Sequence, residues 1–267
     1  MPERARRGRT ARRFRATVEY DGTEFAGFQL QPKARTVQGE LEAALARLTG
    51  GIRCAVDGAG RTDAGVHAAG QVIAFTYAGR LDAAGLEAAL NGQLPPDIAI
   101  RDVRRTQPGF HPRRAARYRE YRYTVWNGPH RPLRERHALG VRVPLDASAM
   151  ERAGQAFVGR HDFSAFGVVI GDRSPVRTVH AVRVRRQGRL VTIDVRADSF
   201  LRSMVRRIVA VLLKVGRGDM TEEEVREALV ARTPARNGAT APAHGLCLRR
   251  VVLGRRSGTA TETNEDR

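Results

Sequence analysis

The stretch VDGAGRTDAGVHAAGQVIAF at residues 56–75 decides how the chain is organised. The apolar run that leads into it, at residues 52–56, and the run at residues 71–77 are both typical of strands. Between these runs, glycines allow backbone angles that are closed to other residues. We therefore expect a loop between two strands that presents Asp63, with Arg61 two residues before it.

The pair of Arg61 and Asp63 has two interpretations. In the first, the arginine favours the ionised carboxylate and the strands fix its direction, as a reactive aspartate requires. In the second, the aspartate bonds its own backbone in a turn and the arginine is solvated. A nucleotide-binding loop fits poorly, because Gly58 and Gly60 lack a third glycine and a strand follows instead of a helix.

The composition indicates a polyanionic partner. The 267 residues include 47 lysines and arginines against 28 acidic residues, for a net charge of +19, and only Lys33 and Lys214 are lysines. Phosphates attract such a surface, and the release of counterions drives binding, so nucleic acid is favoured. The alternative is a compositional drift toward arginine.

The same composition argues against a metal, a membrane span and a secretory signal. Cys54 and Cys247 lack metal-ligand spacing and are interpreted as buried thiols in a reducing compartment, and the scattered histidines form no HxH or HExxH pair. The longest apolar run, residues 208–213, is too short to span a bilayer, and the basic start has no apolar core behind it. We expect a cytoplasmic protein.

Hydrophobic periodicity predicts the order β-α-β-β-α-β twice. The predicted strands are at residues 14–20, 52–56, 71–77 and 98–103, and then at 118–125, 179–185, 190–196 and 246–252. Helices are predicted after the caps Thr36, Asp82 and Asp146, from about Leu201 to Val215, and after Thr221, whose partner Glu224 completes a capping box.

The predicted fold class is α+β, with two ferredoxin-like halves at residues 13–112 and 113–254. The halves are expected to join into a mixed, mainly antiparallel sheet with a central basic cleft, where an RNA helix could lie. Residues 1–12 are predicted to be a disordered basic tail, and residues 255–267 a disordered polar tail.

Tyr121 and Arg206 are two further candidates for a functional role. Period two sends Tyr121 and Tyr123 to one face of a predicted strand, where they either stack on unpaired bases or pack in an ordinary core. Arg206 interrupts an otherwise apolar helix, so it needs a partner such as an active-site carboxylate, unless its head reaches water.

The loop GRTDAGVHAAGQV closely resembles the signature of the tRNA pseudouridine synthase A family, and the resemblance extends over residues 14–252. It includes the opening YDGT…GFQ motif, with Phe28 where tryptophan is usual. It also includes the pairs and triplets Thr36-Val37-Gln38, Leu90-Asn91, Phe110-His111, Tyr121-Arg122-Tyr123, His161-Asp162-Phe163 and Met204-Val205-Arg206.

The resemblance implies a cofactor-free isomerase that converts uridine to pseudouridine at positions 38, 39 and 40 of the tRNA anticodon stem-loop, as a homodimer. It implies that Asp63 is catalytic, either as a nucleophile that attacks C1′ of the ribose or C6 of the base, or as a charge that stabilises a detached-base intermediate. It further implies that Tyr121 packs on the flipped base and helps to remove the C5 proton. Arg61 is expected to hold a phosphate or a neighbour of the displaced base, and Arg206 to be the partner of the Asp63 carboxylate.

Two rival hypotheses come from other classes. A non-enzymatic RNA-binding protein would explain the charge and the aromatic residues, but it gives no reason for an aspartate in a basic groove. A methyltransferase would need a cofactor loop, which the sequence does not contain.

Overall fold

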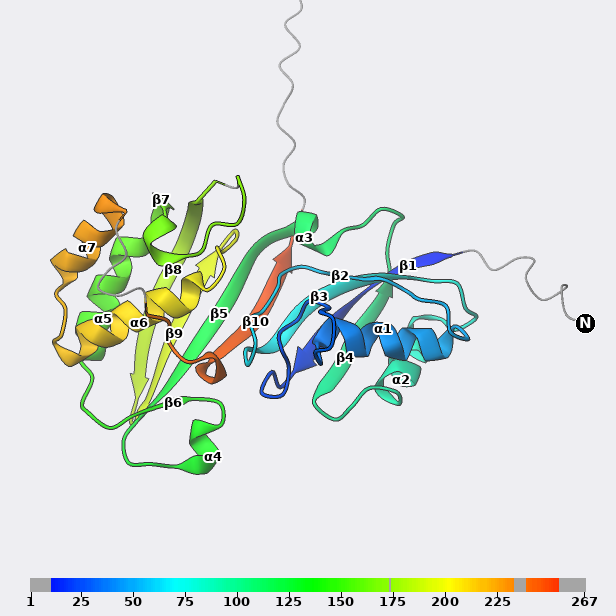
Figure 1. The fold of residues 1–267 in the computed structure, drawn as a ribbon, viewed down its shortest axis with the longest axis horizontal. Helices are drawn as coiled ribbons and strands as arrows, with labels where there is room; N and C mark the ends of the chain where they lie inside the picture. Colours follow the sequence, from blue (N-terminus) through cyan, green and yellow to red (C-terminus); the bar gives the residue numbers. More distant parts are fainter. Residues whose placement is uncertain (1–10, 173, 233–238, 255–267) are drawn as a thin grey trace, which may run out of the picture.

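The computed structural model describes residues 11–172, 174–232 and 239–254. Within these residues, ten strands form one sheet in the order β4-β1-β3-β10-β5-β9-β8-β7, with β2 paired to β3 and β6 paired to β5 (Figure 1). The strands are β1 (Arg12–Tyr20), β2 (Val56–Gly58), β3 (His67–Tyr77), β4 (Ile98–Arg105), β5 (Ala116–Asn127), β6 (Leu139–Val141), β7 (Gly159–Asp162), β8 (Val176–Gln187), β9 (Leu190–Ala197) and β10 (Leu246–Leu253). The α-helices are α1 (Val37–Leu48), α2 (Ala83–Asn91), α3 (Pro112–Ala115), α4 (Pro132–Glu135), α5 (Ala147–Gly154), α6 (Met204–Arg217) and α7 (Glu222–Ala231). The described residues also form the short 3-10 helices η2 (Gln155–Phe157), η3 (Ser164–Phe166) and η5 (Ala243–Gly245).

The strand order shows two halves built in the same way. The first half runs β4-β1-β3-β2 and the second runs β10-β5-β9-β8, which in each case is the order fourth, first, third, second of four main strands. Most pairs are antiparallel, but β3 with β10 and β5 with β6 are parallel. The predicted α+β fold with a large mixed sheet is therefore confirmed.

The two halves meet where β10 pairs with the start of β3. Cys247 lies opposite His67, and Leu248 lies opposite Ala68. This short contact places the residues after Asp63 beside the last strand of the chain, so the candidate loop lies at the junction of the halves.

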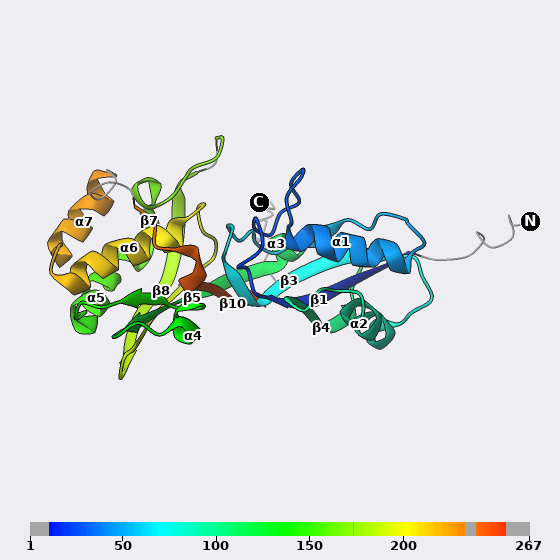
Figure 2. The same cartoon turned by 60° about the horizontal axis from the view of Figure 1, so that its bottom comes forward.

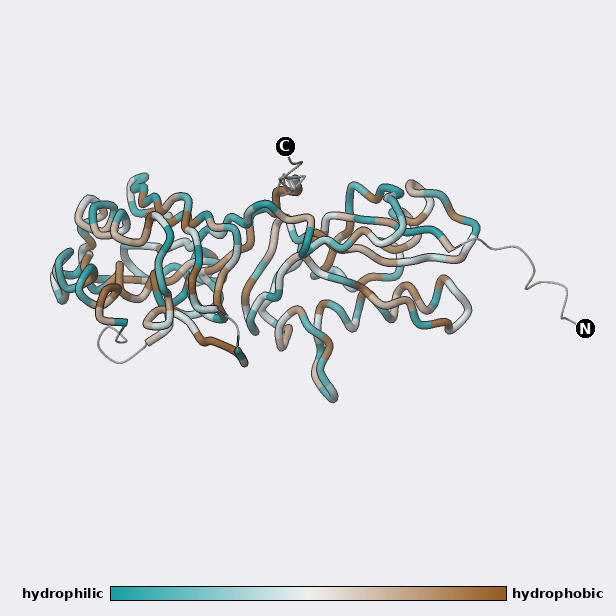
Figure 3. Tube along the Cα trace, turned by 90° about the horizontal axis from the view of Figure 1, so that it is seen from above, coloured by the Kyte–Doolittle hydropathy of each residue, from teal (hydrophilic) through white to brown (hydrophobic). Residues whose placement is uncertain are grey.

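Helices cover the sheet and bury its apolar face. The alternation along β1 buries Phe14, Ala16 and Val18, and α1 contributes Val37 and Leu41 to the same core. Figure 2 shows α1 and α6 on the same side of the sheet, one over each half. Figure 3 shows hydrophobic segments along the tube in both halves. The buried hydrophobic residues form one cluster with members from both halves.

Four helix starts occur where the caps predicted them. Thr36 and Asp82 each accept a hydrogen bond from the backbone three residues later, and Asp146 accepts from two backbone N–H groups. Thr221 forms the predicted capping box with Glu224. Local hydrogen-bond chemistry sets these boundaries, which is why the sequence alone reveals them.

Several predicted boundaries are wrong. The strand predicted at residues 52–56 is replaced by β2, because only Val56–Gly58 pair with β3, and Ile52 is 66% exposed. A strand needs a partner as well as suitable residues. The long helix begins at Met204 instead of Leu201.

The ends of the chain differ from the expectation in one respect. The strand β1 begins at Arg12, where it pairs with Tyr77, so the ordered first half starts one residue before the predicted boundary. Ala11 is exposed and lies outside the strand, and the remaining residues of the predicted tails, 1–10 and 255–267, lie outside the described residues. None of the helices among the described residues is both long enough and apolar enough to cross a membrane.

Candidate active site

The Asp63 loop connects β2 to β3, and the segment at residues 25–28 braces its backbone. The Thr62 carbonyl accepts the Phe28 N–H at 3.1 Å, and the Gly65 N–H donates to the Phe25 carbonyl at 3.2 Å. The opening motif of the chain therefore supports the loop that carries Asp63.

Buried side chains also form hydrogen bonds that hold the same loop in place. Thr62 lies beside Tyr20, with 2.8 Å between the two buried hydroxyl oxygens. Gln71 is fully buried, and its Nε2 donates to the Gly60 carbonyl at 2.9 Å. A buried polar group keeps its position when it is hydrogen-bonded, so these contacts make the loop rigid.

The carboxylate of Asp63 is held by residues from the other half. Ser203 Oγ donates to Oδ2 at 2.9 Å, and Arg206 Nη1 lies 3.5 Å from the same oxygen. The Asp63 side chain is 30% exposed and that of Arg206 is 19% exposed, so the pair is shielded but reachable. The structure thus brings together Asp63 and Arg206 in the pairing that the resemblance implies.

Arg206 is itself fixed by the last part of the chain. Its Nε donates to the Ala241 carbonyl at 2.7 Å, and the Ala241 N–H donates to the Arg206 carbonyl at 3.0 Å. An arginine that is anchored through one nitrogen can present another at a defined place.

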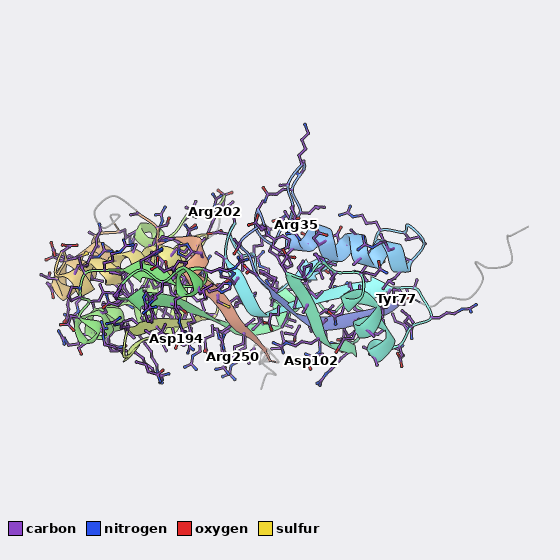
Figure 4. All side chains as sticks on the ribbon, turned by 90° about the horizontal axis from the view of Figure 1, so that it is seen from below. Arg35, Tyr77, Asp102, Asp194, Arg202 and Arg250 are labelled. Carbon is purple, nitrogen blue, oxygen red and sulfur yellow. The ribbon has the colours of Figure 1, made fainter. Side chains whose placement is uncertain are left out.

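Arg61 does not contact Asp63. Its side chain is exposed, and among the described residues it has no hydrogen bond or ion pair. Arg202, next to Ser203, is likewise exposed and has no ion pair within that part of the chain. Figure 4 shows Arg202 near the junction of the halves, on the same side as Arg35. Two cations that have no ion pair with any described residue therefore adjoin the site in sequence, one from each half.

Tyr121 is a buried phenol on β5. As period two predicts, Tyr121 and Tyr123 are buried together, whereas Arg122 points away and pairs with Asp194. The Tyr121 ring meets Phe200 edge-on, with 5.2 Å between centroids. Burial raises the pKa of Tyr121 well above its usual value; Arg119 opposes this, and Asp63 adds to it. Tyr121 therefore keeps its proton at neutral pH.

One further cluster could in principle hold a metal ion. Asp21, His67 and His137 bring three ligand atoms within 4.8 Å of one another. However, the Gly22 N–H already donates to His67 Nδ1 at 3.0 Å, and Arg136 Nη2 lies 3.3 Å from Asp21 Oδ2. A neighbouring guanidinium disfavours a second cation, so we assign no metal here.

Sequence reasoning missed Ser203 and Arg119. Ser203 was placed inside a predicted helix, although a serine before an apolar-periodic run is a start signal that could have revealed it. Arg119 is buried, and its Nη2 donates to the Ala59 carbonyl at 2.6 Å, which ties β5 to the Asp63 loop. Nothing local in the sequence indicates that contact.

The protein-family model described as tRNA pseudouridine synthase matches residues 16–113 and 153–252. A protein named tRNA pseudouridine synthase A from Brevibacillus brevis is 45% identical over 245 residues, which cover 90% of this chain and 99% of the relative. The proteins of the same name from Geobacter sulfurreducens and Thermosipho melanesiensis are both 42% identical, and they cover 90% and 91% of this chain and 99% and 100% of the relatives.

Similarity to solved structures is weaker. A chain from a Cbf5-Nop10-Gar1 complex is 15% identical with a TM-score of 0.28, over 74% of this chain and 54% of that chain. A TM-score this low carries no argument about the fold or the site.

Proposed function

Because the chain belongs to the tRNA pseudouridine synthase family, an isomerase family, we propose that Asp63 is its catalytic carboxylate and that uridine in tRNA is its substrate. The observation that carries this proposal is the contact between Asp63 Oδ2, Ser203 and Arg206 at the junction of the halves. A partly exposed carboxylate with its own cation is a suitable nucleophile in a site that must also attract phosphates.

The chemistry follows from what a carboxylate can do to a uridine. The target nucleotide must leave its stack before Asp63 can reach it. The carboxylate then bonds to C1′ of the ribose or to C6 of the base. In either route the bond between C1′ and N1 breaks, the base turns and C5 bonds to C1′. The bond to the Asp63 carboxylate breaks, so that the carboxylate is released, the C5 proton leaves and N1 gains a proton. The product is an isomer, so no co-reactant is consumed.

Tyr121 is assigned to packing against the flipped base. The charge of Asp63 contributes to the raised pKa of the Tyr121 phenol, and this electrostatic coupling between the two groups supports the role. A phenol that holds its proton at neutral pH is a poor base, so its removal of the C5 proton is the less favoured role.

Arg61 and Arg202 are assigned to the phosphates on either side of the flipped nucleotide. Both are exposed and unpaired among the described residues, and each adjoins a group of the candidate site. We further propose a basic cleft between the halves and a cytoplasmic location, which the charge, the order of elements and the cysteines predict. The family resemblance implies a reaction at tRNA positions 38, 39 and 40 and a homodimer, and we propose these too.

The Asp63→Asn variant tests the proposal. Asparagine keeps the shape of the side chain and can accept from Ser203, but it cannot act as a carboxylate nucleophile. An unmodified tRNA transcript is incubated with protein alone, and pseudouridine is mapped by position. Isomerisation should vanish while tRNA affinity stays within about tenfold, roughly 1.4 kcal/mol, of the unmodified protein.

Asp102→Asn is the matched control, because Asp102 is an exposed carboxylate on β4. It should retain full activity. Substantial pseudouridine formation by Asp63→Asn would refute the catalytic role of Asp63. Equal tRNA binding by all three proteins, with no isomerisation by any, would instead support a non-enzymatic RNA-binding protein.

A further inference from the structure

Ser203 departs from the usual behaviour of a serine at a helix start. It is the N-cap of α6, yet its side chain makes no capping hydrogen bond. Its backbone has a left-handed conformation, with φ of 59° and ψ of 10°. Serine normally caps from an extended conformation, and that bond stabilises a helix by about 1 kcal/mol. Here the hydroxyl donates to Asp63 Oδ2 instead.

The left-handed backbone makes this contact distinctive. A side chain with a Cβ atom is strained at positive φ, and such residues persist where the surroundings hold them, often at functional sites. The surroundings of Ser203 do this on both sides. The Arg202 carbonyl accepts the Val168 N–H at 3.0 Å, and the Ser203 carbonyl accepts the Arg207 N–H at 3.0 Å.

The two donors to Asp63 reach the same oxygen. Ser203 Oγ and Arg206 Nη1 both approach Oδ2, whereas no hydrogen bond within the described residues reaches Oδ1. A carboxylate held through one oxygen cannot rotate freely about its terminal torsion. The other oxygen then keeps a fixed direction and a free lone pair.

We propose that Ser203 is a positioning residue that holds Asp63 Oδ2 together with Arg206, so that Oδ1 is the reacting oxygen. This inference rests on the proposed catalytic role of Asp63. Ser203 itself touches no reacting atom, and its effect on the reaction passes through the direction of the carboxylate. A group misplaced by about 1 Å can slow a reaction by about 100-fold, so a single hydroxyl is sufficient for this effect.

Ser203→Gly provides the decisive test, because it separates the fold from the reaction. Glycine accepts positive φ without strain, so the melting temperature should stay the same or rise. The hydroxyl is lost, so the single-turnover rate of pseudouridine formation should fall about 10- to 100-fold. The affinity for the tRNA transcript should stay within about threefold, since a positioning residue affects the transition state and not binding.

Two further variants complete the design. Ser203→Asn tolerates the left-handed backbone and offers an N–H donor, so it should restore part of the rate. Asp102→Gly is the control, because Asp102 also has a positive φ, of 54°, and in Figure 4 it lies on the other side of the molecule from Arg202. It should leave the rate unchanged.

Each remaining outcome overturns the inference. A Ser203→Gly rate within about twofold of the unmodified protein would show that the hydroxyl is dispensable. A rate that falls together with the melting temperature would assign Ser203 to the fold, and a rate that falls together with tRNA affinity would assign it to tRNA contact. Failure of the proposed function would give a different result, namely substantial pseudouridine formation by Asp63→Asn. That result would show that the carboxylate held by Ser203 is not the catalyst.

Discussion

Gly27 joins the opening motif to the candidate site, and its replacement by alanine gives a prediction of defined size. Gly27 has a φ of 106°, and a Cβ atom added there would lie 2.9 Å from the Thr62 carbonyl oxygen. That carbonyl accepts the hydrogen bond from Phe28 and is directly followed by Asp63. Gly27→Ala must therefore displace the backbone next to the Asp63 carboxylate.

The expected loss of folding stability in Gly27→Ala has two parts. Positive φ costs an alanine about 1–2 kcal/mol. Relief of the contact with the carbonyl weakens one backbone hydrogen bond, which adds about 1 kcal/mol. The sum of about 2–3 kcal/mol corresponds to a melting temperature lower by about 4–12 °C for a chain of this size. A displacement of about half an ångström at Asp63 should also slow the single-turnover rate about 10-fold, since about 1 Å can cost about 100-fold.

Gly51→Ala is the control that isolates the clash. Gly51 has a similar φ of 91°, but a Cβ atom there would meet nothing within 4 Å. This variant should lose only about 1–2 kcal/mol of stability and keep its rate. Melting is followed by circular dichroism, and pseudouridine formation is measured on one tRNA transcript at 25 °C, where both variants are folded. If the Gly27→Ala rate is within about threefold of the Gly51→Ala rate, a shift in the segment at residues 25–28 does not affect the position of Asp63.

Tyr121→Phe should retain most of the activity, because the raised pKa of Tyr121 favours the packing role; a loss of turnover with unchanged tRNA affinity would show that the hydroxyl handles a proton. Binding of tRNA should weaken steeply with salt, and Arg61→Ala and Arg202→Ala should each reduce the slope of log affinity against log salt by about one. Arg250→Ala, whose guanidinium is paired with Glu120, should change that slope least, and three equal slopes would contradict the assignment. Burial lowers the pKa of His67 in the folded chain, so the unfolded chain binds the proton more readily and stability should fall as pH drops below about 6.5. The same dependence of stability on pH in His67→Gln would refute this origin.

The sequence predicted those features of the fold that depend on local chemistry. The caps Thr36, Asp82, Asp146 and Thr221 mark helix starts because each side chain bonds the backbone within three residues. The order of elements then sufficed to predict two similar halves. By contrast, the strand predicted at residues 52–56 shrank to Val56–Gly58, because pairing depends on where β3 lies and not on the apolar run itself.

The candidate site shows the same division. Asp63 and its loop could be predicted, since the motif and the glycines are contiguous in sequence. The structure does not contain the pairing of Arg61 with Asp63 that the local sequence suggested. The cation that reaches the carboxylate is Arg206, which lies 143 residues away in the sequence. Ser203 was hidden for a further reason. Its place before an apolar-periodic run predicts only a helix N-cap. The structure replaces the usual capping hydrogen bond with one to Asp63, which lies in the other half.

The position of Asp63 explains why the chain needs both halves. The first half fixes the backbone of the loop through Phe25 and Phe28, but it supplies no hydrogen bond to the carboxylate among the described residues. The second half supplies Ser203 and Arg206, which hold Oδ2. Only when the halves are docked is the direction of the carboxylate fixed. Any change that loosens the docking should therefore lower the reaction rate before it lowers the content of secondary structure. Apart from the two residue pairs between β3 and β10, the described strands of each half pair within that half.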